Sequence, residues 1–349
     1  RGGVGVDASL RAFAAGFDAA NDAERDAVRD AALPVEQLDP TAPSAPASST
    51  PAPRRTVLGP RLRVHEARIV AEFPVPAHEV LRAGVLRTAD WQDEAWATAY
   101  LDRLVAIRTL DARAPAIDGE PPHALLTESA RHLALWMSYE DTVRVADLKT
   151  RRSRFERVAQ EVRLADGQLL DIGEFLHPRV EEIADTLPAS LGRRLLASAR
   201  LRAWVGRWTR EGRVVKTSSI RGFLLLYAVA SLRGVRRGSL RFAIETARID
   251  AWLARIVTIA PRDPALALEV ARCQRLVKGY GDTHARGWRN FERLMQVEAR
   301  LPAGVLTAAS LRSLREAALA DEGGAALDAA LAGIDRTGPR AATASPRAA

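Results

Sequence analysis

The sequence predicts a mainly α-helical protein of the irregular multi-helix bundle type. Three observations favour this fold class. Apolar residues recur at helical spacing in one segment after another, strand-like alternation is nearly absent, and no tandem repeat of fixed period is present. With 47% apolar and 27% charged residues, the 349-residue chain has the composition of a soluble globular protein. This length is enough for two or three domains with a large core.

The N-terminal residues differ in composition from the body that follows. Residues 4–32 carry an Ala/Phe/Leu stripe that predicts a helix, whereas LDPTAPSAPASSTPAPRR, residues 38–55, cannot bury enough apolar surface to order itself. The chain does not begin with Met, so we expect a piece of a longer protein. The predicted parts are a terminal helix (1–33), a disordered linker (34–57), a helical domain (58–335) and a disordered tail (336–349).

The first half of the helical domain contains long amphipathic segments. Residues 66–73 fit either a short strand or the first turns of a helix. Asp90 is expected to cap a helix that continues to Ile107, and a loop follows over residues 111–122. A long helical pattern begins at Thr127 and continues past Val158.

The second half continues as helix after helix. Pro178 is expected at the first position of a helix that ends at Pro188. Helices are also expected on both sides of residues 277–287. Helical periodicity predicts further segments over residues 189–210, 219–232, 239–259, 307–320 and 324–333.

Apolar runs and cysteine content limit the functional classes. The longest apolar run, Gly222 to Leu232, has 11 residues and is too short to cross a bilayer. We find no signal peptide, so we expect a cytoplasmic protein with no membrane partner. The only cysteine, Cys273, lies in an apolar-periodic segment and is interpreted as a core residue. Any iron–sulfur cluster must therefore be carried by another chain or domain.

Positive charge alone does not indicate nucleic-acid binding. The net charge is +8, but only three lysines are present, and the arginines often lie three or four residues from an acid. The local basic cluster RGVRRGSLR, residues 233–241, is interpreted as a solvated loop. Nucleic acid is therefore the least favoured partner.

Residues 277–287, VKGYGDTHARG, interrupt the helical pattern. Gly279 suits the left-handed end of one helix, and Asp282 or Thr283 suits the cap of the next. Caps do not explain the second glycine or the concentration of cations, and N–H groups at a helix start attract anions. A structural hairpin and an anion-binding loop both remain open. The candidate anion-binding residues are Lys278, Gly279, Tyr280, Gly281, Asp282, Thr283, His284 and Arg286.

Two other stretches carry candidate site residues. Residues 134–158 contain charges of alternating sign every three or four positions, which on one helix form either an ion-pair ladder or a polar cleft facing a ligand or subunit. In residues 171–188, His177 precedes a helix start, but no second histidine is near, so no metal site is expected. No motif identifies a nucleophile or a catalytic dyad, and the catalytic residues stay unknown. The stripe is Glu140, Arg144, Asp147, Arg151 and Arg154. The cleft or interface candidates are Tyr139, Glu140, Asp141, Arg144, Asp147, Lys149, His177 and Arg179.

Three parts of the chain together resemble a known family. They are LRTADWQDEAWATAYLDRL, then ARHLALWMSYEDTVRVADLKTRRSRF with EFLHPRVEEIADTLPASLGRRLL, and RLVKGYGDTHARGWRNFERL. They are similar to the helical C-terminal region of indolepyruvate ferredoxin oxidoreductase beta-type subunits, over about residues 58–320. The opening RGGVGVDASLRAFAAGFDAA resembles the last helix of that family's preceding α/β domain, of the pyruvate/ketoisovalerate oxidoreductase type, which is otherwise missing here.

The resemblance implies a supporting role in an oxidoreductase complex. In that family an arylpyruvate such as indolepyruvate is oxidatively decarboxylated to an acyl-CoA, and the electrons pass to ferredoxin. Thiamine diphosphate and the iron–sulfur clusters belong to the partner alpha-type subunit, and CoA is a further candidate ligand. The resemblance therefore implies an accessory domain that docks the thiamine-bearing subunit or supplies an anion-binding loop. Such a domain is not expected to be catalytic on its own. The alternative is a protein interaction domain with no ligand site.

Overall fold

In a computed structural model of the chain, the described residues are 56–162, 168, 170–176, 178–209, 213–279, 281–302, 304–321 and 323–337. The chain divides into two units, Arg1–Arg54 and Arg55–Ala349, and the described residues belong to the second. The helix predicted over residues 4–32, nearly all of the predicted linker and the tail from residue 338 lie outside the described residues.

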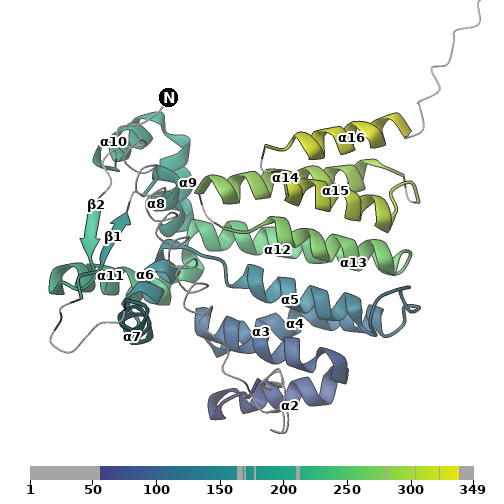
Figure 1. Cartoon of the computed structure of the whole chain (residues 1–349), viewed down its shortest axis with the longest axis horizontal. Coiled ribbons are helices and arrows are strands. Elements are labelled where there is room, and N and C mark those ends of the chain that lie inside the picture. Colours follow the sequence, from purple (N-terminus) through teal and green to yellow (C-terminus); the bar gives the residue numbers. More distant parts are fainter. Residues whose placement is uncertain are drawn as a thin grey trace, which may run out of the picture. The chain divides into compact units, whose positions relative to one another are not determined.

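The described part is mainly α-helical, which confirms the predicted fold class (Figure 1). No helix in it is both long enough and apolar enough to span a bilayer. The strands are β1 (Gly173–Leu176) and β2 (Arg213–Lys216), and the 3-10 helices are η1 (Pro60–Leu62), η2 (Val75–Ala77), η3 (Leu232–Gly238) and η4 (Gln274–Leu276). The α-helices are α2 (Arg63–Glu72), α3 (His78–Trp91), α4 (Glu94–Asp111), α5 (Ala124–Met137), α6 (Thr142–Thr150), α7 (Arg152–Glu161), α8 (Val180–Thr186), α9 (Ala189–Ala197), α10 (Ala199–Thr209), α11 (Ile220–Ser231), α12 (Leu240–Ile259), α13 (Pro264–Cys273), α14 (Gly281–Arg300), α15 (Ala308–Ala320) and α16 (Ala325–Thr337).

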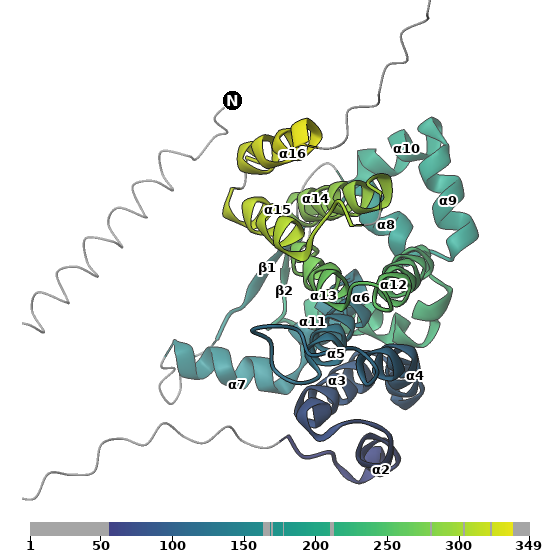
Figure 2. The ribbon, with the colours of Figure 1, turned by 90° about the vertical axis from the view of Figure 1, so that its right-hand side faces the viewer.

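Helices α2–α5 and α12–α16 form a stack with one large core (Figures 1 and 2). Trp91, Tyr100 and Trp136 are among its largest fully buried side chains. The Trp136 ring lies 5.6 Å from Trp252 and 5.5 Å from Phe291, measured between ring centres. Aromatic contacts therefore join helices that are far apart in the sequence. Cys273 is buried in the same core, which confirms its interpretation as a core residue.

Helices α6–α11 and the two strands form a smaller group beside the stack (Figure 1). Ala184, Leu195 and Leu240 form a small second core between α8, α9 and the start of α12. Strands β1 and β2 pair antiparallel, with Gly173 opposite Lys216. This two-stranded sheet was not predicted, because each strand has four residues and three helices separate the strands in sequence.

Side-chain caps explain several helix starts. Ser219 and Ser239 accept hydrogen bonds from the N–H groups of Gly222 and Phe242, at 3.1 and 3.2 Å, which confirms the predicted segments 219–232 and 239–259. The prediction that Asp90 caps a helix is wrong. Asp90 lies in the last turn of α3, and Asp93 caps α4 by accepting from Trp96 N at 2.8 Å.

The single long helix predicted from Thr127 past Val158 is wrong. Helix α5 ends at Met137, and Asp141 caps α6 by accepting from Arg144 N at 2.6 Å. Arg151 then has an extended backbone, with φ −71° and ψ 135°, and separates α6 from α7. The break has a physical basis, because a cap at Asp141 needs a non-helical backbone at that residue.

The structure decides one prediction that was left open and corrects two others. Residues 66–73, left open between strand and helix, lie in α2 up to Glu72. The segment 189–210 is two helices, because Ser198 is extended between α9 and α10. Pro178 is not the first helical residue, since α8 begins at Val180.

Helix α14 passes so close to η4 that a side chain at residue 287 would collide with backbone. A Cβ on Gly287 would lie 2.1 Å from the carbonyl oxygen of Leu276, whereas a Cβ on Gly333 of α16 would meet no atom within 4 Å. We expect Gly287→Ala to lower the free energy of unfolding by about 1–3 kcal/mol through overpacking. Gly333→Ala is the control and should raise it by up to about 1 kcal/mol. Urea unfolding measures both, and equal effects would contradict the close approach.

Candidate functional site

Arg241 of α12 is the residue at which the three polar stretches of the sequence meet. Its guanidinium lies over the ring of Tyr139, 5.6 Å from the ring centre. Its Nη1 lies 3.4 Å from Asp185 Oδ2, and its Nη2 donates to Nε2 of His284 at 3.1 Å. Tyr139 follows α5, Asp185 belongs to α8, and His284 lies in the first turn of α14. The convergence joins parts of the chain that the sequence leaves separate.

Glu245 is the buried carboxylate beneath this group, with a side chain 1% exposed. It lies 3.0 Å from Arg241 Nη2 and 3.0 Å from Arg248 Nη1, and its Oε2 accepts from Trp136 Nε1 at 2.7 Å. The guanidinium of Arg248 lies 3.7 Å from the ring centre of Trp288. One carboxylate therefore faces two guanidinium groups. We call Tyr139, Asp185, Arg241, Glu245, Arg248, His284 and Trp288 the Arg241 cluster.

Burial sets the protonation states in the Arg241 cluster. Burial, and then the neighbouring Arg241 charge, lower the pKa of His284, so the imidazole is neutral at pH 7. Burial also raises the pKa of the Asp185 carboxyl. The pKa of Tyr139 is raised well above its ordinary value by burial, and the hydroxyl keeps its proton.

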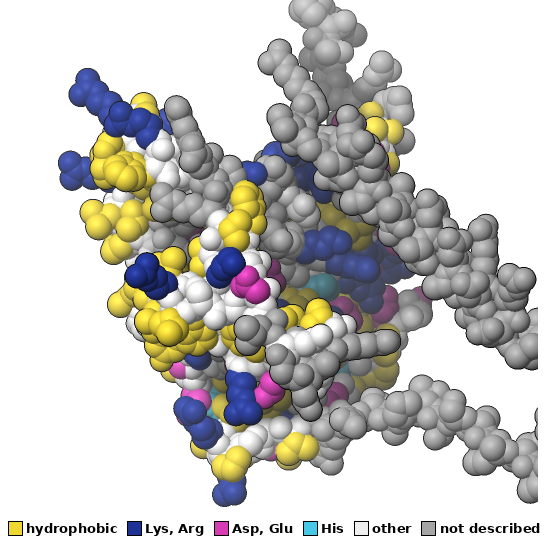
Figure 3. Space-filling view, turned by 60° about the vertical axis from the view of Figure 1, so that its left-hand side comes forward, with side chains coloured by type: hydrophobic (Ala, Val, Ile, Leu, Met, Phe, Trp, Pro, Cys, Tyr) yellow, Lys and Arg dark blue, Asp and Glu magenta, His cyan; other side chains and the backbone are white. Residues whose placement is uncertain are grey.

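Two buried polar atoms of the Arg241 cluster stand out by their hydrogen bonding. Within the described residues, neither the Tyr139 hydroxyl nor Arg241 Nε has a hydrogen-bond partner. Both are donors, and buried donors without partners are rare because they cost free energy. An anion or a water molecule in contact with both would remove that cost. On the face shown in Figure 3, Lys and Arg side chains lie close to a histidine and to acidic side chains.

A surface cavity lies elsewhere, between α14 and α16. Its volume is about 510 Å3, and the ion pair of Arg293 with Asp328, 2.5 Å long, lies at its wall. It shares no lining residue with the Arg241 cluster, so it does not bear on the chemistry there. The cavity is lined by Arg293, Gln296, Val297, Arg300, Asp328, Leu331 and Ala332.

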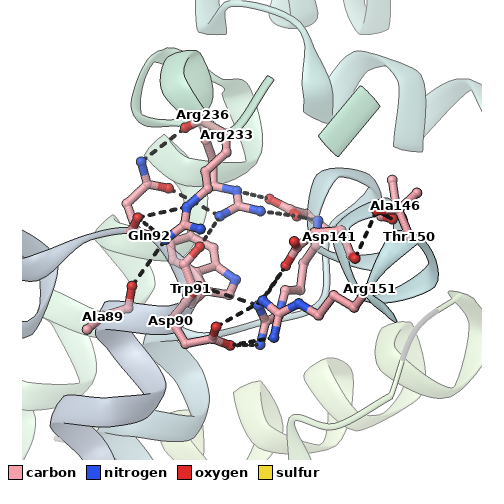
Figure 4. A network of polar contacts seen from close by, with 12 residues as sticks. Ala89, Asp90, Trp91, Gln92, Asp141, Ala146, Thr150, Arg151, Arg233 and Arg236 are labelled. Atoms are coloured by element: carbon pink, nitrogen blue, oxygen red, sulfur yellow. Dashed lines mark hydrogen bonds and ion pairs between the residues drawn. The ribbon is translucent and has the colours of Figure 1, made fainter. Parts of the chain in front are cut away.

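A second polar network surrounds Arg236, whose side chain is 1% exposed (Figure 4). Its Nε lies 2.9 Å from Asp141 Oδ2, and its Nη2 donates to Asp141 Oδ1 at 3.1 Å. Nη1 donates to the carbonyl oxygen of Trp91 at 2.6 Å, and the guanidinium lies 4.1 Å from the centre of the Trp91 ring. These contacts hold the end of α3, the start of α6 and η3 together, which is a structural role.

The interpretation of residues 233–241 as a solvated loop is wrong. Arg236 is buried, and Arg233 donates to the carbonyl oxygens of Ala89 and Gln92. The physical reason is the end of α3, whose last carbonyl groups lack partners within the helix and accept hydrogen bonds from cationic side chains.

The charged stripe of residues 140–154 is only partly an ion-pair ladder. Asp147 accepts from Arg144 at 3.0 Å and from Arg151 at 2.6 Å, and both arginines also reach Asp90, at 2.6 and 2.9 Å. Burial alone would raise the pKa of Asp90, but the hydrogen bonds from Arg151 and Arg144 lower it. This part of the stripe therefore matches the ion-pair ladder, which was the alternative to a polar cleft.

The rest of the stripe departs from a single helical face. Arg154 of α7 and Lys149 of α6 both bind Glu174, which is buried on β1. Glu140 is exposed between α5 and α6. The single-helix stripe was therefore wrong, because two breaks in the helix turn its members in different directions.

The loop at residues 277–287 is confirmed in part. Gly279 has φ +74°, the predicted left-handed conformation, but the preceding helical segment ends earlier than predicted, at Leu276 of η4. Helix α14 begins at Gly281, so the prediction that Asp282 or Thr283 precedes the helix is wrong. Lys278 and Thr283 are exposed, and Arg286 is half-buried.

Some of the candidate site residues lie outside the described residues, and others lie away from the Arg241 cluster. Tyr280 and His177 fall outside the described residues, as does the side chain of Asp282. Arg179 is exposed, and its backbone N–H donates to Glu182 Oε2 at 3.3 Å. Of the candidate residues named from the sequence, Tyr139 and His284 reach Arg241.

Sequence reasoning missed Arg241, Glu245 and Arg248, although the sequence holds a signal for them. They occupy positions i, i+4 and i+7 of the helix 239–259, in line with Trp252 on its buried side. Charged residues on the apolar face of a helix indicate a buried polar cluster.

The family to which these residues belong is shown by comparison with known proteins. The model of DUF6537, a family of unknown function, matches residues 77–297. The chain belongs to the DUF6537 family. No curated protein and no solved structure matches it. The DUF6537 match spans the whole Arg241 cluster and the Arg236 network.

The lowered pKa of His284 predicts a pH dependence of stability for this DUF6537 chain. The unfolded state, with a histidine pKa of about 6.5, binds the proton more strongly than the folded state. The stability from neutral His284 is therefore complete above about pH 6.5 and is lost as pH falls through the folded pKa. We expect the Tm to fall between pH 7.5 and 5.5, and His284→Gln to reduce that fall.

Thr283→Ala, on the same turn but exposed, is the control and should keep the wild-type slope of Tm against pH. Asp185 works in the opposite direction, because its raised pKa favours the folded state at low pH, but it is present in all three proteins. A wild-type slope in His284→Gln would show that His284 does not carry the effect.

Proposed function

We propose that the chain is an accessory helical domain of a cytoplasmic arylpyruvate ferredoxin oxidoreductase of the indolepyruvate type. Its Arg241 cluster contacts an anionic group of the substrate or of CoA. The observation that carries the proposal is the convergence on Arg241 of Tyr139, Asp185 and His284, one from each polar stretch of the sequence.

The chemistry of the cluster suits an aromatic or phosphorylated anion. Guanidinium groups bind carboxylates and phosphates through paired N–H donors, and Arg248 and Arg241 share one carboxylate between them. The Tyr139 hydroxyl supplies a further donor. An arylpyruvate has a carboxylate and an aromatic ring, and CoA has phosphates. Thiamine diphosphate and the iron–sulfur clusters are expected on the alpha-type partner, with ferredoxin as electron acceptor, so no bond-breaking step falls to this chain.

Thermal shift with separate additions of indolepyruvate, CoA and thiamine diphosphate tests the proposal. A ligand at 100 times its Kd should stabilise the chain by about 2.7 kcal/mol. We expect indolepyruvate or CoA to raise the Tm of the wild type, and this rise to be lost in Arg248→Gln and reduced in Lys278→Ala. Arg262→Gln, at an exposed arginine just after α12, is the matched control and should keep the rise. No shift with any ligand, both alone and in complex with the thiamine-bearing subunit, would overturn the anion contact.

The alternative is an interaction domain without a ligand, and the ladder of Asp90, Arg144, Asp147 and Arg151 favours it. Under this alternative, Asp147→Arg breaks assembly with the thiamine-bearing subunit, while Lys278→Ala and Arg248→Gln change neither assembly nor activity. Analytical ultracentrifugation of the mixed subunits measures assembly, and the turnover of the complex measures activity.

A further inference from the structure

Helix α10 presents an apolar stripe to solvent. None of its residues is buried. Leu201, Trp204 and Trp208 follow one another at three- and four-residue spacing, so they share one face of the helix, and their side chains are 39%, 54% and 67% exposed. The two tryptophan rings lie edge to face, 6.5 Å apart between centres. Such a stripe of large apolar side chains marks an interaction surface when it is left uncovered.

The charged residues of α9 and α10 themselves all have one sign. Residues 189–209, which form α9 and α10, contain five arginines and no acidic residue. Helical geometry puts Arg200 and Arg207 along one edge of the stripe. Elsewhere in the described chain many arginines pair with acids, as Arg144 and Arg236 do. The five exposed arginines form no ion pair within the described residues: Arg193, Arg194, Arg200, Arg202 and Arg207.

We propose that α9 and α10 form a docking surface for an acidic protein, which places hydrophobic side chains against Trp204 and Trp208 and carboxylates against the arginines. Charge complementarity fixes the sign of the partner. Trp and Arg are the residues that contribute most to protein–protein binding, and an apolar centre with a charged rim is the usual anatomy of such an interface. The proposal does not rest on the proposed function, because α9 and α10 contribute no residue to the Arg241 cluster.

Two other kinds of anionic partner, a membrane surface and a single-stranded nucleic acid, fit this geometry less well than an acidic protein does. A helix that lies in a membrane surface needs a wide apolar face, and the exposed stripe of α10 is narrow because Val205 on its neighbouring side packs toward α8 and α9. Single-stranded nucleic acid stacks its bases on aromatic rings, whereas Leu191 and Leu201 add exposed aliphatic surface that offers no stacking. Aliphatic, aromatic and guanidinium groups together fit a protein surface.

Fluorescence anisotropy of labelled peptides on the full chain tests the proposal. The probe is a helical peptide with Leu and Phe on one face and flanking Glu, and its counterpart has Lys in place of Glu. We expect the acidic peptide alone to bind. Its Kd should rise at least tenfold in Trp204→Ala/Trp208→Ala and in Arg200→Glu/Arg207→Glu. Arg63→Glu on α2, also exposed, is the control and should bind as the wild type does. Because α10 has no buried residue, circular dichroism should show both double variants folded.

Three results would overturn the proposal. One is equal binding of the Lys peptide, and another is binding that the double variants leave unchanged. The third is failure of the acidic peptide to bind. If phosphatidylserine vesicles or a thymidine 20-mer then bind in a way that depends on Trp204 and Trp208, the surface belongs to a lipid or a nucleic acid instead.

Discussion

Glu245→Ala should lower the free energy of unfolding by about 3–5 kcal/mol, the cost typical of removing one partner from a buried ion pair. The Glu245 carboxylate is 1% exposed and faces two guanidinium groups, each at 3.0 Å. Without it, Arg241 and Arg248 keep their charges close together with only the Asp185 carboxyl left beside Arg241, and Trp136 Nε1 loses its acceptor. Urea unfolding followed by tryptophan fluorescence measures the change, since Trp136 and Trp288 report on this part of the core.

A second substitution at Glu245 separates the contribution of its charge from that of its hydrogen bond, and a surface variant on the same helix serves as the control. Glu245→Gln keeps an acceptor for Trp136 but removes the negative charge, so it should fall between Glu245→Ala and the wild type. Asp250→Ala is the matched control on the same helix, because Asp250 pairs with Arg103 at the surface, 3.2 Å away. Its cost should be at most about 1 kcal/mol. If Glu245→Ala costs no more than Asp250→Ala, the two arginines do not depend on the buried carboxylate.

Arg236→Ala is expected to have an effect of similar size, about 3–5 kcal/mol, for the opposite reason. It leaves the Asp141 carboxylate buried without its cation, and it removes the donor to the Trp91 carbonyl oxygen. The ring of Trp91 also loses the guanidinium that lies 4.1 Å from its centre. Chemical unfolding of the purified chain measures the loss.

Arg237→Ala is the control for Arg236→Ala, because the neighbouring side chain makes an exposed ion pair with Asp93, 2.7 Å long. Its removal should change the free energy of unfolding by at most about 1 kcal/mol. Asp141→Ala should cost at least as much as Arg236→Ala, because it also removes the cap of α6. The double variant should cost less than the sum of the two single changes. Additive losses would show that the two residues act separately.

The sequence predicted those helices whose boundaries are set by local chemistry. Ser219 and Ser239 cap the helices that follow them, and Gly279 takes the predicted left-handed conformation, although η4 ends three residues before it. The break between α6 and α7 could not be found in this way. Arg151 adopts an extended backbone beside contacts to Asp90, which lies 61 residues earlier.

The candidate site, too, could be predicted from the sequence only in part. His284 and Tyr139 were named because unusual residues gather around them in the sequence. Arg241 was assigned to the basic cluster of residues 233–241, interpreted as a solvated loop, and Glu245 was not singled out, because their burial shows only once the packing of α12 is known. Whether a charged residue on an apolar helix face is buried depends on the neighbouring helices, and the spacing of residues within one helix carries no information about them.

The ion pair between Asp141 and Arg236 lies where the chain leaves the helical stack and where it returns to it. Helix α5 ends four residues before Asp141, and α12 begins four residues after Arg236. In topological terms α6–α11 are an insertion whose two ends are tied together at its base. Closing a loop costs only about 0.6 kcal/mol more for each doubling of its length. The insertion can therefore change in length, or carry new surfaces such as α9 and α10, with little cost to the stack that holds its ends.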